Sequence, residues 1–271
     1  MDPKIGVFDS GFGGLTVLKA LLKELPAARF AFLGDTARLP YGSKSQRTIA
    51  RYAAESAQFL VNEQGAEYLV IACNTASALA LDAIKEAVAV PVLGVIEPGA
   101  AAAAASSASR DVMVIATEAT VASHAYAAAC RAQGLHGVEK ACPLLVPLVE
   151  EGWIDSPVTA EVVRIYLGEL LAEAKAAGQS PDTLVLGCTH YPLLRSVFEA
   201  AVPAGVRVID SAEATAAEAA LQISGLASQV STESGPRIQC FATDSVEKFE
   251  RLGSRFLGLP VGKVQLVDLG G

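Results

Sequence analysis

Two cysteines, Cys73 and Cys188, stand in matching sequence contexts that suit proton-transfer chemistry. Each follows an apolar run and a small residue and precedes hydrogen-bonding side chains, in Leu69-Val-Ile-Ala-Cys-Asn-Thr-Ala and Leu184-Val-Leu-Gly-Cys-Thr-His-Tyr. The apolar runs predict buried strands, so each thiol is expected at a strand end under the start of a helix. There the helix dipole and free backbone N–H groups lower the pKa of a thiol and create a usable base.

A single buried cysteine is more often a small core residue than a reactive group. Two cysteines in equivalent contexts favour chemistry instead, because two thiols facing one carbon could remove a proton from one side and return it to the other. A Cys–His hydrolase would need one cysteine with a histidine across the site, whereas His190 follows its own Cys188 by two residues. Proton transfer is therefore favoured over acyl transfer. The other thiols are predicted as core residues: Cys130, Cys142 and Cys240.

Carboxylates at the ends of the first two predicted strands are candidates to assist the thiols. Asp9 and Ser10 end the first strand and Asp35 ends the second. Asp9 equally suits a helix cap, and Asp35 a turn residue, so both interpretations stay open. The segment Gly11-Phe-Gly-Gly lacks the GxGxxG spacing, and the chain has no GxxxxGK[ST] motif. Lys44, the nearest candidate for a Schiff base, lies in a polar loop, so a cofactor-free site is predicted.

An α/β fold must position these residues. Apolar runs of strand length alternate with Ala-rich amphipathic stretches, which is typical of mainly parallel sheets flanked by helices. In the second half, strands are predicted at 112–116, 183–186 and 206–209, and reactive groups are expected beyond the carboxyl ends of strands. The repeated motifs predict two similar, pseudo-twofold-related domains with the active site in the cleft between them. We predict a discontinuous first domain, 1–97 plus 210–271, carrying Cys73, and a second domain, 98–209, carrying Cys188.

Composition excludes several classes of protein. The 271 residues are 52% hydrophobic and 18% charged, which excludes a disordered chain. The apolar runs are far shorter than a membrane span. A net charge of −8 argues against a nucleic-acid partner. Five cysteines without a CxxC pair predict neither structural disulfides nor a metal site. We expect a cytoplasmic globular protein with no membrane or nucleic-acid partner.

Four segments strongly resemble those of the bacterial glutamate racemase family. They are Phe8-Asp-Ser-Gly-Phe-Gly-Gly-Leu, Leu33-Gly-Asp-Thr-Ala-Arg-Leu-Pro-Tyr-Gly, Ile71-Ala-Cys-Asn-Thr-Ala-Ser-Ala and Leu186-Gly-Cys-Thr-His-Tyr-Pro-Leu. The resemblance continues through Val208-Ile-Asp-Ser to Phe241-Ala-Thr-Asp and covers nearly the whole chain. It implies cofactor-independent interconversion of L- and D-glutamate, which supplies D-glutamate for peptidoglycan. We also expect a homodimer.

The resemblance also implies roles for individual residues. Cys73 and Cys188 would be the two catalytic bases, one for each enantiomer, with Asp9 near the first thiol and His190 and Glu150 assisting the second. The implied substrate-binding residues are Asp9, Ser10, Tyr41, Gly42, Asn74, Thr75, Thr117, Thr120, Thr189 and His190. Such hydroxyls and loop amides can hold carboxylates without an arginine. From the residues alone, Glu150 could equally be surface charge. Aspartate racemases typically carry Glu where this chain has His190, which favours glutamate; an aspartate racemase and a non-catalytic amino-acid-binding protein are the alternatives.

Overall fold

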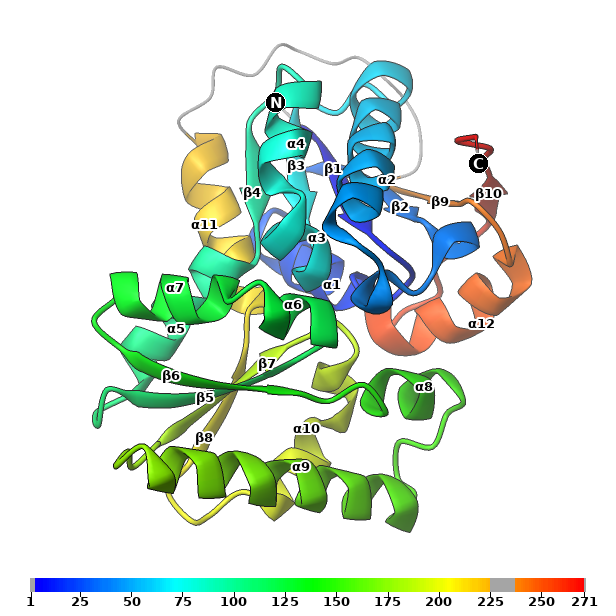
Figure 1. Ribbon diagram of the computed structural model, residues 1–271. Helices are drawn as coiled ribbons and strands as arrows, with labels where there is room; N and C mark the ends of the chain where they lie inside the picture. Colours follow the sequence, from blue (N-terminus) through cyan, green and yellow to red (C-terminus); the bar gives the residue numbers. More distant parts are fainter. Residues whose placement is uncertain (1–2, 225–236, 271) are drawn as a thin grey trace.

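The strands form two parallel sheets in the computed structural model, which describes residues 3–224 and 237–270 (Figure 1). The larger sheet has the order β10-β9-β2-β1-β3-β4 and the smaller has the order β6-β5-β7-β8. The predicted α/β class is confirmed. The strands of the larger sheet are β1 (Lys4–Asp9), β2 (Arg29–Gly34), β3 (Tyr68–Ile71), β4 (Val92–Gly94), β9 (Ile238–Ala242) and β10 (Val264–Leu266). Those of the smaller sheet are β5 (Asp111–Ala116), β6 (His136–Ala141), β7 (Thr183–Gly187) and β8 (Arg207–Asp210).

The two sheets share one topology. Numbered along the chain, the first four strands of each sheet have the spatial order second, first, third, fourth, giving β2-β1-β3-β4 and β6-β5-β7-β8. Cys73 follows β3 and Cys188 follows β7, so the thiols occupy equivalent places, as the repeated sequence motif predicts. Asp9 ends β1, and Thr117 follows the equivalent strand β5. Because all these strands are parallel, their carboxyl ends gather at one edge of each sheet.

Helices cover both faces of the larger sheet. Ile5 and Val7 of β1 belong to one buried cluster and Phe8 to another, so this strand is buried on both sides. Burial on both sides explains the continuous apolar sequences of the central strands. The helices are α1 (Leu15–Glu24), α2 (Gln46–Gln58), α3 (Asn74–Leu79), α4 (Leu81–Ala87), α5 (Ile96–Ser106), α6 (Glu118–Ala122), α7 (Ala125–Ala132), α8 (Leu145–Glu150), α9 (Pro157–Ala176), α10 (Arg195–Ala201), α11 (Ala212–Ser224) and α12 (Val246–Leu257).

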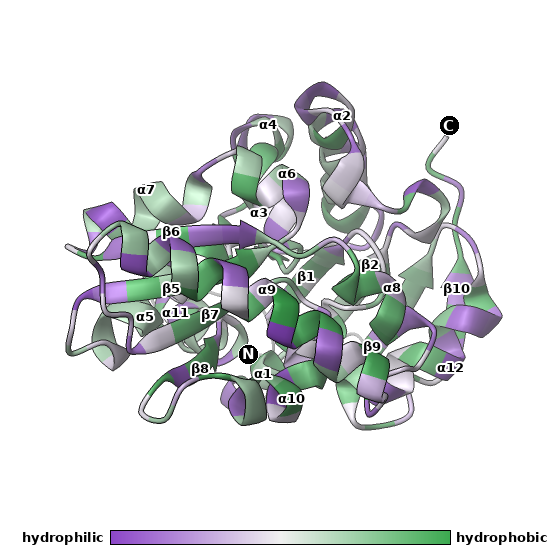
Figure 2. Ribbon diagram, turned by 60° about the horizontal axis from the view of Figure 1, so that its bottom comes forward, coloured by the Kyte–Doolittle hydropathy of each residue, from purple (hydrophilic) through white to green (hydrophobic). Residues whose placement is uncertain are grey.

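Strand β6 is absent from the sequence-based prediction, which was wrong here. Its sequence, His136-Gly-Val-Glu-Lys-Ala, contains no apolar run. It lies at the edge of the smaller sheet and pairs only with β5 among the described strands, so its side chains stay partly exposed. Figure 2 shows hydrophilic colours along this strand. An edge strand does not need apolar side chains on both faces, and the period-based signal is therefore lost.

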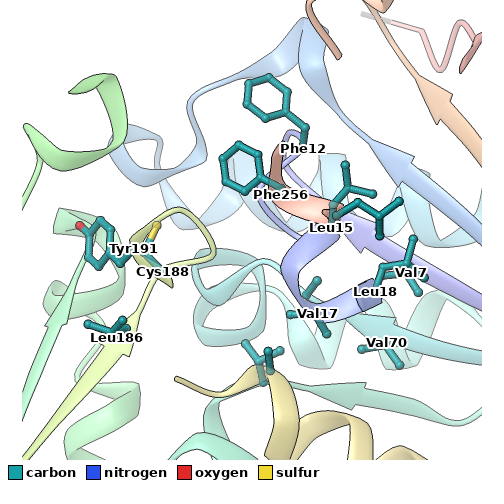
Figure 3. Packing of buried hydrophobic residues seen from close by; sticks show 14 of the residues in the cluster. Val7, Phe12, Leu15, Val17, Leu18, Val70, Leu186, Cys188, Tyr191 and Phe256 are labelled. Carbon is teal, nitrogen blue, oxygen red and sulfur yellow. The ribbon is translucent and has the colours of Figure 1, made fainter. Parts of the chain in front are cut away.

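The largest buried cluster extends across both sheets. It contains Val7 and Val70 of the larger sheet and Leu184 and Leu186 of the smaller one. Phe12 and Phe256 pack together, with ring centroids 5.6 Å apart, and Figure 3 shows them in the same cluster as Cys188 and Tyr191. Within the described ranges, no helix is long and apolar enough to cross a membrane. The apolar contact between the sheets holds their carboxyl edges near each other.

Candidate active site

A cavity of about 330 Å³ opens where the carboxyl edges of the two sheets meet. The structure brings eleven of the thirteen predicted site residues to its wall; they are Ser10, Tyr41, Gly42, Cys73, Asn74, Thr75, Thr117, Glu150, Cys188, Thr189 and His190. The other two, Asp9 and Thr120, do not line the cavity and lie buried beside it. Both thiols therefore open into one space, and that space has the size of a pocket for a small ligand.

Cys73 ends the loop after β3 and caps the short helix α3. Its sulfur accepts a hydrogen bond from the backbone N–H of Ala76 (3.4 Å), and its thiol donates to Ser10 Oγ (3.4 Å). Burial raises the pKa of Cys73 to about 12, and the charge of Asp9 adds to the increase. The hydrogen bonds with Ser10 and Ala76 oppose that shift but do not reverse it. The expectation that the helix start lowers the pKa of this thiol is therefore wrong, because desolvation is the larger effect.

Asp9 lies beneath the cavity and joins the two halves of the site. Its carboxylate accepts hydrogen bonds from the Gly11 N–H (3.0 Å) and from Thr189 Oγ1 (3.5 Å), which comes from the loop after β7. Burial raises the pKa of Asp9, although the charge of His190 and the hydrogen bonds act in the opposite direction. Asp9 can thus influence both thiols through electrostatics and positioning without being part of the cavity wall.

Cys188 begins a chain of polar contacts that reaches across the site. Its sulfur lies 3.9 Å from His190 Nδ1, and His190 Nε2 lies 3.2 Å from Glu150 Oε1. Lys248 Nζ then donates to Glu150 Oε2 (3.0 Å). Burial alone would lower the pKa of His190, but the hydrogen bonds with Cys188 and Glu150 raise it to about 10. At neutral pH an imidazolium therefore lies beside the Cys188 sulfur.

Hydroxyl groups from both halves meet on another part of the wall. Thr75 Oγ1 lies 2.9 Å from Thr117 Oγ1 and 3.2 Å from Thr120 Oγ1, and the last two are 2.9 Å apart. Thr117 also caps α6 by accepting from the Thr120 N–H (3.4 Å). Nearby, Tyr126 donates to Asn74 Oδ1 (2.7 Å), which fixes the amide group of a wall residue. Several donors thus converge where a carboxylate could bind.

Tyr41 is held in the wall by a buried ion pair behind it. Its hydroxyl donates to the carboxylate of Asp35, which also pairs with Arg38 Nε (2.7 Å) and accepts from Thr243 Oγ1 (2.9 Å). Burial is the first cause of the raised pKa of Tyr41, followed by the charge of Asp35, so the phenol keeps its proton. Asp35 is therefore a supporting residue rather than a simple turn residue, and it acts through Tyr41.

Three supporting residues escaped the sequence analysis, namely Lys248, Tyr126 and Arg38. Lys248 lies 98 residues from Glu150, so no local spacing indicated the pair. Tyr126 could have been suspected as the one aromatic residue of the Ala-rich helix α7. Arg38 lies within the motif quoted above, three residues after Asp35, and that spacing was an available signal. In the described part of the chain, no group of three or more His, Cys, Asp or Glu side chains could hold a metal ion.

Comparison with known proteins identifies close relatives of this chain. A family model described as Asp/Glu/Hydantoin racemase matches residues 5–219. A glutamate racemase from Koribacter versatilis is 53% identical over 290 residues, which cover 99% of this chain and 98% of that protein.

Solved structures give the same result. The crystal structure of a glutamate racemase from Bacillus anthracis has a TM-score of 0.87 at 37% identity and covers 98% of both chains. A glutamate racemase from Francisella tularensis, in complex with D-glutamate, has a TM-score of 0.85 at 34% identity and covers 99% of this chain and 98% of that one. The similarity therefore includes both sheets and both thiol-bearing loops.

Proposed function

Because this chain belongs to the Asp/Glu/hydantoin racemase family, we propose that its cavity binds glutamate between Cys73 and Cys188, which exchange the α-proton. The activity is that of a glutamate racemase, a cofactor-independent isomerase that interconverts L- and D-glutamate. The observation that carries the two-thiol mechanism is that the cysteines following β3 and β7 open into the same cavity. One thiolate removes the proton from one face, the other thiol protonates the opposite face, and the configuration inverts.

The two thiols act on opposite faces of the α-carbon in this proposal. Cys73, with its pKa raised to about 12, carries a proton at neutral pH and can supply it to one face. Cys188 lies 3.9 Å from the imidazolium of His190 and acts on the other face. After a turnover, the thiol that removed the α-proton is protonated and the other is not, so the proton must be redistributed before the same enantiomer reacts again.

Polar groups on the wall would hold the two carboxylates of glutamate. Thr75 and Thr117 supply hydroxyl groups, and Asn74 supplies an amide held by Tyr126. His190 is the one residue on the described wall that carries positive charge at neutral pH, so most of the binding comes from neutral donors. Apolar residues on the wall reduce the access of water, which strengthens each of these contacts.

The remaining sequence predictions complete the proposal. D-Glutamate made here would supply peptidoglycan synthesis in the cytoplasm, and the active protein would be a homodimer. The predicted domains are 1–97 plus 210–271 and 98–209, and a division of this kind is supported by the membership of the strands in two separate sheets, with β8 (Arg207–Asp210) and α5 (Ile96–Ser106) crossing the predicted bounds. Sedimentation of the purified protein would test the dimer, and limited proteolysis would test the bounds.

Proton NMR of L-glutamate in D₂O with pyridoxal-free protein tests the proposed reaction. We expect the α-proton signal of L-glutamate to disappear and the circular dichroism of the L-glutamate solution to fall to zero. Cys73→Ala and Cys188→Ala should each abolish racemisation while the far-ultraviolet spectrum stays unchanged. Cys130→Ala is the matched control, because this buried thiol lies on α7 and not on the cavity wall.

The outcomes separate the alternatives. Racemisation by Cys73→Ala or Cys188→Ala at a near wild-type rate would refute the two-thiol mechanism. Exchange of the α-proton of aspartate but not of glutamate would assign the activity of an aspartate racemase. Binding of glutamate without exchange would leave an amino-acid-binding protein.

A further inference from the structure

Helix α12 brings a lysine from one half of the molecule to the catalytic histidine loop of the other. The helix follows β9 of the larger sheet, whereas Glu150 ends α8 and His190 follows β7 of the smaller sheet. Figure 1 shows α12 and α8 facing each other where the two halves meet. Lys248 Nζ reaches Glu150 Oε2 at 3.0 Å, and no interaction within the smaller-sheet half holds this oxygen among those described.

The contact surrounds His190 with groups from α12. Phe256, two turns beyond Lys248, lies with its ring centroid 5.3 Å from that of His190 in an edge-on arrangement. Phe12, from the loop before α1, lies 6.0 Å from His190 and 5.8 Å from Lys248 Nζ. The imidazole is therefore held by Glu150 and packed against two rings of the larger-sheet half.

We propose that Lys248 is a positioning residue for the reaction, which fixes Glu150 so that His190 stays aimed at Cys188. His190, Glu150 and Lys248 alternate in charge as imidazolium, carboxylate and ammonium, and His190 Nδ1 lies 3.9 Å from the Cys188 sulfur. Each charged neighbour stabilises the next, so removing the ammonium group weakens the hold on Glu150 and, through it, on His190. Lys248 does not line the cavity, and its effect must pass through Glu150.

The arrangement also makes the orientation of His190 depend on contact between the two halves of the molecule. Glu150, His190 and Cys188 all belong to the smaller-sheet half, and only Lys248 is supplied by the other. The side chain of Lys248 is 37% exposed, so the pair can separate into water at little cost. His190 then keeps its contacts with Cys188 and Glu150 and its charge interaction with Asp9, but loses the group that orients Glu150. The Cys188 side of the site is thus complete only when the halves meet as described here.

Kinetics of Lys248→Met and Lys248→Arg test this inference, which rests on the two-thiol reaction proposed above. We expect Lys248→Met to lower kcat about two- to fivefold, the size of effect that a partly exposed ion pair supplies, with KM unchanged. Lys248→Arg should retain most of kcat. Lys140→Met is the matched control, because Lys140 pairs with Glu169 and Glu173 away from the cavity.

A double-mutant cycle and isotope effects separate positioning from a purely structural role. In the Glu150→Gln background, Lys248→Met should cause no further loss of kcat, since its effect passes through that carboxylate. With α-deuterated substrates, slowing the Cys188 step should raise the isotope effect on kcat/KM for the enantiomer that Cys188 deprotonates and lower it for the other. Because the equilibrium constant of a racemisation is 1, kcat/KM itself falls equally in both directions.

Either of two results would overturn the inference. Lys248→Met could behave like Lys140→Met, or its effect could add fully to that of Glu150→Gln. Melting temperatures of all variants identify any that lose activity by unfolding, and Lys248→Arg then carries the test. If the wild-type protein exchanges no α-proton, the proposed reaction fails; if it does and the Lys248 variants match the control, only the role of Lys248 fails.

Discussion

Gly13 lies where the loop before α1 meets the loop that carries Thr189 and His190. A Cβ atom added at this position would lie 2.5 Å from Thr189 Oγ1 and 2.7 Å from His190 Nδ1. Ordinary van der Waals contact begins near 3.4 Å, so the hydroxyl would have to move by about 0.9 Å and the ring by about 0.7 Å. The loop has little freedom to move, because Thr189 donates to Asp9 and the imidazole packs against Phe12.

Gly13→Ala should therefore disturb catalysis more than folding. The distance from His190 Nδ1 to the Cys188 sulfur is 3.9 Å, so a shift of this size changes the geometry of that contact. Overpacking costs about 1–3 kcal/mol of unfolding free energy. A displacement of about 1 Å in a catalytic group costs roughly 10²-fold in rate. We expect kcat to fall about a hundredfold, with a folded protein that melts several degrees lower.

Circular dichroism measures both kcat, from the racemisation of glutamate, and the melting temperature, from thermal unfolding. Gly168→Ala is the control, since its added Cβ meets nothing within 4 Å in the middle of α9. This control should gain about 0.5–1 kcal/mol of stability and keep its activity. If Gly13→Ala folds and retains kcat within twofold, the contact between Gly13 and His190 does not position the histidine, and our reasoning about this loop is wrong.

Two further predictions concern the groups around the cavity. Asp35→Ala should lower the free energy of unfolding by about 1–3 kcal/mol, because Arg38 loses its buried partner and keeps only Glu55, and KM should rise as Tyr41 loosens. Chemical denaturation measures this, with exposed Glu86→Ala as the control, and a loss below 1 kcal/mol would contradict it. The pKa of His190 is raised to about 10, so the stability from its protonation is present below pH 6.5 and is lost as the pH rises through 10. We expect kcat/KM to fall as the pH rises through about 10, and we expect Glu150→Gln to move this fall to lower pH. A fall of kcat/KM that is already centred near pH 6.5 in the wild-type protein would exclude the imidazolium.

The fold class and the loops that carry the chemistry could be predicted from local sequence patterns. Strand and helix periods are local properties, and a strand buried on both faces, such as β3 or β7, must be apolar throughout. Cys73 and Cys188 each follow such a strand, so their equivalence could be predicted from the repeated motif. Strand β6 was missed because an edge strand needs little apolar surface.

The way in which these residues act together depends on contacts between distant parts of the chain. Asp9 was predicted as a catalytic and substrate-binding residue, and the loops pack so that it lies beside the cavity wall and accepts a hydrogen bond from Thr189, 180 residues away. Cys73 was expected to be acidic from its place before a helix, but burial by surrounding elements raises its pKa. Lys248 has no local signal at all. Desolvation and long-range ion pairs depend on which surfaces pack against each other in the folded protein. Hydrophobic periodicity and motif spacing are local properties of the chain, so they do not predict these contacts.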